Sequence, residues 1–349
     1  MIIADRYHRQ RLVEDIGDVG QEGICQSHIA IVGVGALGCM SADMLARAGV
    51  GTITLIDRDI VEYTNLQRQV LFTEEDARTH QPKAIAAACR LQAINSSIEV
   101  RAHVEDLTTL NVDRLLEGVD LIIDGLDNFR TRYVLNDYAV KNCKPYLFAG
   151  VIAGTGNVMT IIPAEPATPC LRCLFPEPPP VGSQETCDTA GIIAPAVGIA
   201  ASCQCCDALK LLSGNRDKIS NTLLVFDVWN SQSQRHEIGE PNKTCPCCQE
   251  LDFSFLESAG SPEAAALCGQ NAVQIPGTEN IDLSRLAKRL ESHGTFTLAS
   301  PLLRGSLHEE LSRDGEPIIL LCFEDGRAII HGTDDVGRAK AIHARFIGT

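Results

Sequence analysis

The sequence predicts an α/β protein built on a doubly wound, mostly parallel sheet, followed by a small α+β unit. Three observations lead to this prediction. Short apolar segments alternate with segments of helical character through most of the chain, as in a parallel sheet covered by helices. A glycine-rich turn joins the first strand to a helix. After about residue 252 a segment of mostly polar and small residues follows, and beyond it short strands alternate with helices.

The predicted elements follow one another in a regular order. Early strands are expected at residues 28–32, 52–57, 98–102 and 119–124. Helices are expected at residues 39–48, 82–94, 128–141 and 194–212. Later strands are expected at residues 146–149, 158–162, 223–228 and 234–238. The chain is therefore divided into a domain over residues 1–252, a linker over 253–266 and a small α+β domain over 267–349, which ends in a helix over 334–347.

Composition narrows the class of protein. The 349 residues are 45% hydrophobic and 21% charged, which is ordinary for a folded globular protein. A net charge of −15 argues against nucleic acid as the main partner, because phosphate binding needs a positive surface. The sequence shows no signal peptide and no apolar run of membrane-spanning length. With fifteen cysteines, this favours a cytoplasmic protein whose paired thiols bind metal rather than form disulfides.

The glycine-rich turn has the GxGxxG pattern of a nucleotide-binding loop. Gly33 and Gly35 allow a tight turn and close approach of a phosphate, and Gly38 allows the helix to pack closely on the strand. Asp57 ends the next strand, where a carboxylate binds ribose hydroxyls. The pattern predicts a Rossmann-like site, and by itself it leaves NAD and ATP as alternatives.

Charged residues outside this loop are candidates for holding a polyphosphate. The sequence has no GxxxxGK[ST] loop, so a triphosphate would need other partners. Arg9, Arg68 and Lys83 supply positive charge, and Asp127, followed by Asn128, supplies a carboxylate of the kind that Mg²⁺ prefers. Each of these residues is also common on surfaces and at helix starts.

Two cysteine pairs have the spacing of a structural zinc site. Cys170/Cys173 and Cys245/Cys248 each place two thiolates two residues apart, so that together they complete a tetrahedral site of four thiolates. Cys247 is a spare ligand, and Cys248 is preferred because it preserves the spacing.

Other cysteines divide into a candidate nucleophile and candidate core residues. Cys187 lies in a polar segment before the helix at 194–212, a setting that suits either a reactive thiol or an ordinary loop cysteine. Cys203, Cys205 and Cys206 lie inside that apolar helix and are expected to be small core residues.

Taken together, the motifs resemble the MoeB/ThiF/HesA family, the prokaryotic relatives of ubiquitin-activating enzymes. The resemblance covers roughly residues 4–250. It is carried by the glycine loop, the two CxxC pairs and the segments Arg6-Tyr-His-Arg-Gln10, Asn65-Leu-Gln-Arg-Gln69, Gln81-Pro-Lys83, Asp124-Gly-Leu-Asp-Asn128 and Thr186-Cys-Asp-Thr-Ala-Gly-Ile-Ile-Ala-Pro195. The resemblance implies ATP-dependent adenylylation of the Gly-Gly carboxylate of a ubiquitin-like sulfur-carrier protein, in thiamin or molybdopterin synthesis.

The resemblance also implies roles for individual residues. Adenosine is expected at Gly35 and Asp57, phosphates at Asn65 and Lys83, and Mg²⁺ at Asp127.

The remaining implied roles involve a second subunit and a later step. Arg68 is expected at the phosphates, and Arg9 and Arg68 at a homodimer interface, with one arginine reaching the neighbouring ATP. Cys187 matches the family cysteine that some members use as a thiol acceptor in sulfur transfer and others do not need.

The tail departs from family members that carry a rhodanese domain. The segment from Cys322 to Arg327 contains Glu324 and Asp325, whereas a persulfide loop should be cationic. Asp325-Gly326 between apolar runs predicts a hairpin turn instead. We therefore expect a non-catalytic tail and an external sulfur donor such as a cysteine desulfurase.

Three other interpretations remain at this point. A related enzyme could activate a different carboxylate, for example one on modified tRNA. An NAD-dependent oxidoreductase would explain the glycine loop and Asp57, but not Lys83 together with the cysteine pairs. A zinc-stapled scaffold would bind nucleotide without turnover.

Overall fold

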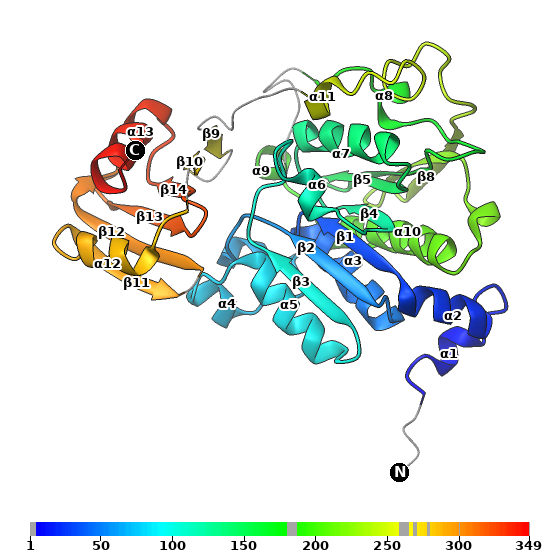
Figure 1. Cartoon of the computed structure of the whole chain (residues 1–349), viewed down its shortest axis with the longest axis horizontal. Helices are drawn as coiled ribbons and strands as arrows, with labels where there is room; N and C mark the ends of the chain where they lie inside the picture. The colour runs from blue at the N-terminus through cyan, green and yellow to red at the C-terminus, as the bar shows by residue number, and fades with distance from the viewer. Residues whose placement is uncertain are drawn as a thin grey trace. The chain divides into compact units, whose positions relative to one another are not determined.

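The computed structural model describes residues 5–179, 187–257, 265–267, 271–277, 280–299 and 301–348 (Figure 1). The chain folds as two compact units, Met1–Ser258 and Ala259–Thr349. The first unit extends beyond the predicted boundary at residue 252, into the predicted linker. The reason is that α11 (Ser254–Glu257) packs against α7 (Phe129–Lys141), where the rings of Phe255 and Tyr133 lie 4.7 Å apart.

An eight-stranded sheet forms the centre of the first unit, in the order β3-β2-β1-β4-β5-β6-β7-β8. Its strands are β1 (His28–Val32), β2 (Thr52–Ile56), β3 (Glu99–His103), β4 (Leu121–Asp124), β5 (Tyr146–Ile152), β6 (Thr155–Ile161), β7 (Thr222–Asp227) and β8 (Gln232–Glu237). The strands from β3 to β5 pair in parallel, and β6, β7 and β8 are added antiparallel. The predicted mostly parallel α/β sheet is confirmed.

Helices cover both faces of this sheet. They are α1 (His8–Arg11), α2 (Gly17–Gln26), α3 (Ala36–Ala48), α4 (Glu74–Arg78), α5 (Lys83–Ile94), α6 (Val112–Leu115), α7, α8 (Leu171–Leu174), α9 (Cys187–Ala190) and α10 (Ala194–Leu212), with 3-10 turns η1 (Tyr63–Asn65) and η2 (Arg216–Lys218). In β1, Ile29 and Ile31 pack with α3, α5 and α10, whereas Ala30 and Val32 pack with α6 and α7. This alternation follows from the two-residue period of a strand.

No helix in the described part of the chain is both long and apolar enough to cross a bilayer.

The helix after the glycine loop begins earlier than predicted. We expected it to start at residue 39, but α3 begins at Ala36, with Gly35 as its N-cap. The pattern of large apolar residues starts late because the first turn is made largely of small residues, which lets it approach the sheet closely. As a consequence, the amino end of α3 opens directly into the glycine loop.

The second unit is a six-stranded antiparallel sheet, in the order β11-β12-β13-β14-β10-β9. Its elements are β9 (Ala265–Leu267), β10 (Ala272–Ile275), α12 (Leu283–Leu290), β11 (Gly294–Ala299), β12 (Leu302–Leu311), β13 (Pro317–Phe323), β14 (Ala328–His331) and α13 (Val336–Phe346). Both helices pack with the sheet in one core. The predicted turn at Asp325-Gly326 is confirmed, because it joins β13 to β14 and Gly326 has a left-handed φ of 81°.

Candidate nucleotide-binding site and cysteine cluster

The glycine loop between β1 and α3 brings backbone segments into direct contact. Gly33 has a left-handed φ of 86°, which residues with side chains rarely adopt. A Cβ atom on Gly38 would lie 1.9 Å from the carbonyl oxygen of Gly33, and one on Gly125, after β4, would lie 2.1 Å from the same oxygen. At Gly35 the nearest atom to such a Cβ is 3.9 Å away. Open space therefore remains at Gly35, in front of the first amides of α3, where a phosphate would bind.

Asp57 follows β2 and holds the glycine loop from the side. Its buried carboxylate accepts hydrogen bonds from the backbone N–H of Val34 at 2.6 Å and of Asp59 at 2.7 Å. Burial raises the pKa of Asp57 to about 6, against the opposing influence of the Lys83 ammonium. At neutral pH the carboxylate is ionised, and its remaining lone pairs suit the ribose hydroxyls predicted from the sequence.

Lys83 is a buried positive charge at the start of α5. Its Nζ lies 3.1 Å from a carboxylate oxygen of Asp59, and only 7% of the residue is exposed. Burial alone would lower the pKa of Lys83, but the carboxylates of Asp59, Asp57 and Asp127 hold it above its ordinary value. Lys83 is therefore protonated at neutral pH. The sequence did not single out Asp59, which fixes the ammonium.

The segment after β2 supplies three more predicted or neighbouring residues. The side chain of Asn65 accepts the backbone N–H of Glu62 at 2.9 Å, and Arg68 donates to the carbonyl of Thr64 at 2.9 Å. Gln69 is buried near the space at Gly35, and its Oε1 finds no hydrogen-bond partner in the described part of the chain. Both predicted side chains thus stabilise their own turn, and Gln69 is a site residue that the sequence analysis missed.

The turn after β4 presents the predicted Mg²⁺ ligand. Asp127 is exposed, and its charge acts on Lys83 and on Arg132. Asn128 caps α7 by accepting the backbone N–H of Thr131 at 3.0 Å. A freely accessible carboxylate beside fixed cations suits Mg²⁺ shared with phosphate oxygens.

Arg9 does not join these residues within one chain. Tyr7, just before α1, packs against Gly49 at the carboxyl end of α3, and Arg6 donates to the carbonyl of Ile94 at the end of α5. The glycine loop lies at the other end of α3, whose thirteen residues span about 20 Å. The N-terminal segment is thus placed at the edge of the sheet opposite the nucleotide site.

The four predicted cysteines come together as a cluster. The sulfur atoms of Cys170, Cys173, Cys245 and Cys248 all lie within 4.8 Å of one another. The Sγ–Sγ distance is 3.6 Å between Cys170 and Cys245, and 3.4 Å between Cys173 and Cys248. Four sulfurs at about 2.3 Å from a central ion would be roughly 3.8 Å apart, so the cluster fits a tetrahedral metal.

Cys247 lies outside this cluster. Its buried sulfur accepts a hydrogen bond from the Asn136 amide at 3.3 Å. Of the two alternatives left open by the sequence, the geometry therefore favours Cys248. Cys187 begins α9, but its side chain lies outside the described residues.

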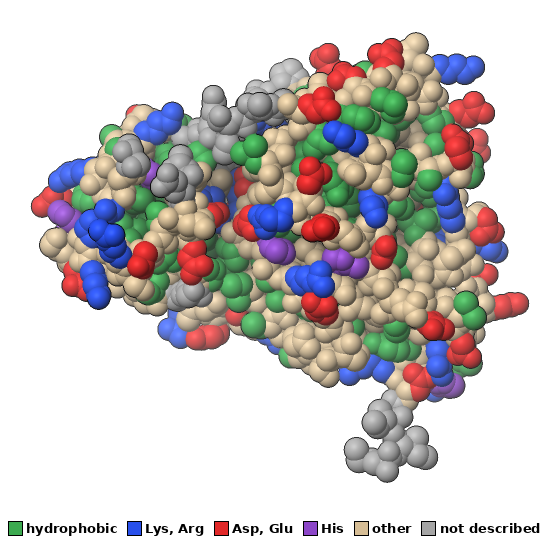
Figure 2. Space-filling model, in the orientation of Figure 1, with side chains coloured by type: hydrophobic (Ala, Val, Ile, Leu, Met, Phe, Trp, Pro, Cys, Tyr) green, Lys and Arg blue, Asp and Glu red, His purple; other side chains and the backbone are tan. Residues whose placement is uncertain are grey.

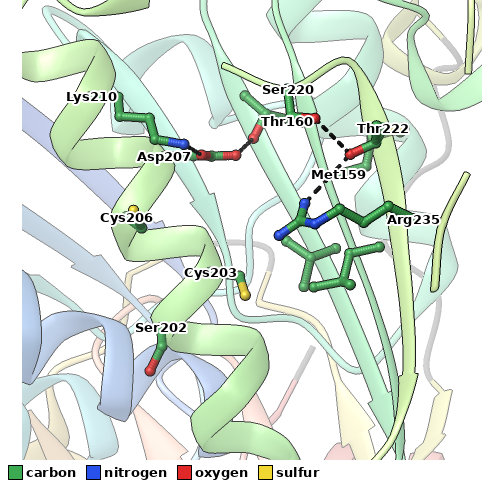
Figure 3. Close-up of a pocket in the computed structure, with 12 residues that line it drawn as sticks. Met159, Thr160, Ser202, Cys203, Cys206, Asp207, Lys210, Ser220, Thr222 and Arg235 are labelled. Atoms are coloured by element: carbon green, nitrogen blue, oxygen red, sulfur yellow. Dashed lines mark hydrogen bonds and ion pairs between the residues drawn. The ribbon is translucent and has the colours of Figure 1, made fainter. Parts of the chain in front are cut away.

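A separate pocket of about 350 Å³ lies between α10 and the antiparallel strands (Figure 3). Lys210 pairs with Asp207 at 2.8 Å on one wall, and Arg235 stands on the other. Cys203 and Cys206 also line it; Cys206 is exposed, so its prediction as a core residue is wrong, whereas Cys203 is half-buried and packs against the apolar core. Cys205, on the same helix, is buried, as predicted. None of the predicted nucleotide-binding residues lines this pocket.

Fold and site together define an α/β protein with a glycine loop of the kind that binds nucleotides and a paired-cysteine cluster. The sequence matches the ThiF family over residues 7–247. It is 43% identical over 346 residues to the sulfur carrier protein ThiS adenylyltransferase of Bacillus subtilis, covering 98% of this chain and 99% of that protein. It is 38% identical over 248 residues to the sulfur carrier protein adenylyltransferase of Thermus thermophilus, covering 70% of this chain and 90% of that protein.

The same fold occurs among solved structures. E. coli MccB with ATP matches with a TM-score of 0.61 at 24% identity, over 70% of this chain and 75% of that chain. The chain belongs to the ThiF family, as the motifs indicated.

The pKa of Asp57 predicts a pH dependence of nucleotide binding. The ionised carboxylate accepts the Val34 N–H, so binding is fully supported above the pKa and weakens as pH falls through about 6. We expect ATP affinity, measured by calorimetry, to fall by up to about fourfold between pH 7.5 and 5.5, because a pKa of about 6 leaves roughly a quarter of the carboxylate ionised at pH 5.5. Asp57→Asn is the control, since any pH dependence left in it belongs to ATP. An equal dependence in both proteins would contradict the prediction.

Proposed function

We propose that this chain is an ATP-dependent adenylyltransferase that activates the C-terminal Gly-Gly carboxylate of a ubiquitin-like sulfur-carrier protein, for thiamin or molybdopterin synthesis. The observation that carries the proposal is the 43% identity, over 98% of the chain, to a protein named for adenylylation of ThiS. A ThiS-like carrier is favoured because this match includes the C-terminal unit. A relative named MOCS3, from Anopheles gambiae, matches 70% of the chain.

The chemistry follows from charge and alignment. The triphosphate lies against the amino end of α3, where Lys83, Asn65 and Arg68 contact its oxygens. A carboxylate oxygen of the carrier attacks the α-phosphorus, the bond to the pyrophosphate oxygen breaks, and pyrophosphate leaves with its electron pair. Mg²⁺, held by Asp127 and phosphate oxygens, would neutralise charge on the leaving pyrophosphate. No protein nucleophile is needed, so alignment and neutralisation carry this step.

The alternatives gain no support from the structure. A nicotinamide-dependent oxidoreductase would use the glycine loop and Asp57 but has no need of Lys83 beside Asp127. A carboxylate on tRNA would call for a basic surface. Figure 2 instead shows acidic and basic side chains interspersed over the face in view, in a chain of net charge −15.

A later sulfur-transfer step is assigned to Cys187. The residue just after its helix, Gly191, accepts the backbone N–H of Ala153, so this segment returns to the carboxyl edge of the sheet, where the glycine loop also lies. Cys322 is unsuited to the role, because it is buried in β13 and burial raises its pKa to about 12. We therefore assign the sulfur to an external donor such as a cysteine desulfurase rather than to Cys322.

A structural Zn²⁺ and a homodimer complete the proposal. The all-thiolate cluster has the ligands and spacing that zinc prefers, and its closed, largely buried setting suits a structural rather than a catalytic metal. The position of Arg9 supports the homodimer, because this arginine can reach a nucleotide site only in a second subunit.

Adenylylation predicts ATP–pyrophosphate exchange that requires Mg²⁺ and a ThiS-like carrier with an intact Gly-Gly end. Asp127→Ala should lower the exchange rate by about 10²-fold or more, because phosphate charge is then poorly neutralised. Cys187→Ala should leave exchange unchanged, because the thiol acts later. A folded wild-type protein that binds ATP but shows no exchange with ThiS-like or MoaD-like carriers would refute the proposal.

The zinc assignment predicts different outcomes for two neighbouring cysteines. Cys248→Ser should release the metal and lower the free energy of unfolding by about 3–5 kcal/mol, because metal binding is linked to folding. Cys247→Ser is the matched control, and it should retain one metal ion per chain. Metal content by mass spectrometry and urea unfolding test both. Loss of metal from the Cys247 variant alone would reverse the assignment.

The homodimer predicts complementation between two inactive variants. Arg9→Ala and Lys83→Ala each damage both sites of a homodimer. A mixed dimer keeps one intact site if Arg9 acts on the partner's nucleotide, so co-expression should restore about a quarter of wild-type exchange. The double variant on one chain, co-expressed with itself, is the control. No recovery from dimers shown to be mixed would refute the action of Arg9 on the partner's nucleotide.

A further inference from the structure

A buried ion pair stands beside the turn that carries Asp127. Asp124, the last residue of β4, is fully buried, and Arg132, in the first turns of α7, is 5% exposed. The Nε of Arg132 donates to Oδ2 of Asp124 at 3.0 Å, and the hydroxyl of Tyr146 donates to the same oxygen at 2.7 Å. The other carboxylate oxygen accepts the backbone N–H of Leu126 at 2.9 Å. Both oxygens of Asp124 are therefore occupied.

The guanidinium of Arg132 ties the same turn to the sheet. One of its terminal nitrogens donates to the carbonyl of Leu126 at 2.6 Å and to that of Ala149, in β5, at 2.8 Å. Its central carbon lies 5.1 Å from the centre of the Phe148 ring, so aromatic packing also restrains it. A lysine cannot reproduce these contacts, because it has a single ammonium rather than a planar fork of donors.

The two sets of contacts meet at Leu126. Its backbone N–H donates to Asp124, and its carbonyl accepts a hydrogen bond from Arg132. Both backbone polar groups of the residue before Asp127 are therefore fixed. On the other side, Asn128 caps α7. The Asp127 carboxylate is exposed, yet the backbone on both sides of it is held by groups that themselves point into the protein.

We propose that Arg132, supported by Tyr146, is a positioning residue that sets the place of the Asp127 carboxylate relative to the phosphates at the amino end of α3. Its effect is to raise the affinity for ATP with Mg²⁺ above the affinity for ATP alone. This inference rests on the proposed function, which assigns Mg²⁺ to Asp127. Arg132 acts through the turn and not by contact with the nucleotide.

The test compares ATP binding with and without Mg²⁺ in the full-length, metal-loaded protein. Calorimetry with ATP in MgCl₂ and in EDTA gives the gain in affinity that Mg²⁺ provides. In Arg132→Lys this gain should be at least about tenfold smaller than in the wild type, because a small displacement of a metal ligand weakens binding strongly. The affinity of the variant for ATP in EDTA should stay within about twofold of the wild-type value. Tyr146→Phe removes one hydrogen bond and should lose about two- to fourfold of the gain. The Mg²⁺ concentration for half-maximal exchange should rise in parallel.

The same helix supplies a matched control. Arg172 forms a second buried ion pair, with Asp137 of α7, at 3.4 Å. Arg172→Lys should lower the melting temperature, as Arg132→Lys does, but leave the Mg²⁺ gain unchanged. If both lysine variants lose stability and both keep the full gain, Arg132 is only structural and the inference is overturned.

Two further results separate other causes. If Arg132→Lys does not fold, Tyr146→Phe decides, and an undiminished gain in that folded variant overturns the inference. If Asp127→Ala retains the Mg²⁺ gain of the wild type, the placement of Mg²⁺ is wrong, and the inference fails with it. Loss of the gain in Asp127→Ala but not in the Arg132 and Tyr146 variants refutes the inference alone.

Discussion

The close approach of two backbone turns at the carboxyl edge of the sheet is the constraint on which the nucleotide site depends. The carbonyl oxygen of Gly33 faces both Gly38 and Gly125, at distances that leave no room for a Cβ atom on either. Because these contacts are between backbone atoms, no side-chain adjustment can relieve a clash. The contact fixes the amino end of α3 against the turn that carries Asp127. The candidate phosphate-binding amides and the candidate Mg²⁺ ligand therefore come from one rigid junction.

Charge imposes a second condition on this junction. Lys83 is buried among carboxylates, and Asp57, Asp59 and Asp127 all act on it. A triphosphate entering this region meets the buried Lys83 ammonium together with several negative groups in an acidic chain. Additional positive charge favours binding, and Arg68, Mg²⁺ and an arginine from a second subunit are the sources that the proposal supplies. The buried Asp59–Lys83 pair keeps the ammonium in place before any ligand arrives.

The sequence predicted those features that depend on local spacing. The helix at 194–212 has the predicted bounds, and both the glycine loop and the cysteine pairs are formed as expected. The direction of the late strands was not predicted, although the two-residue link at Ala153-Gly154 is too short for a parallel crossover.

Residues whose role depends on distant partners could not be found in this way. Arg132 and Tyr146 meet at Asp124 only because α7 and β5 pack beside β4, and no spacing encodes that meeting. Gln69 needs the fold to bury it near Gly35. The error at Cys206 is different in kind. Apolar character was taken for burial on every side of α10, whereas only one face of that helix packs on the sheet.

Helix α7 connects the two chemically distinct parts of the first unit. Its amino end is fixed by Asn128 and by the ion pair of Arg132 with Asp124. Further along, Asn136 accepts the backbone N–H of Leu171 at 2.8 Å, between the paired cysteines, and donates to the sulfur of Cys247. The cysteine cluster is thus attached to the helix that presents the Asp127 turn. A metal bound by the cluster would therefore stabilise the middle of α7, whereas the contacts of Arg132 and Asn128 hold the turn at its amino end.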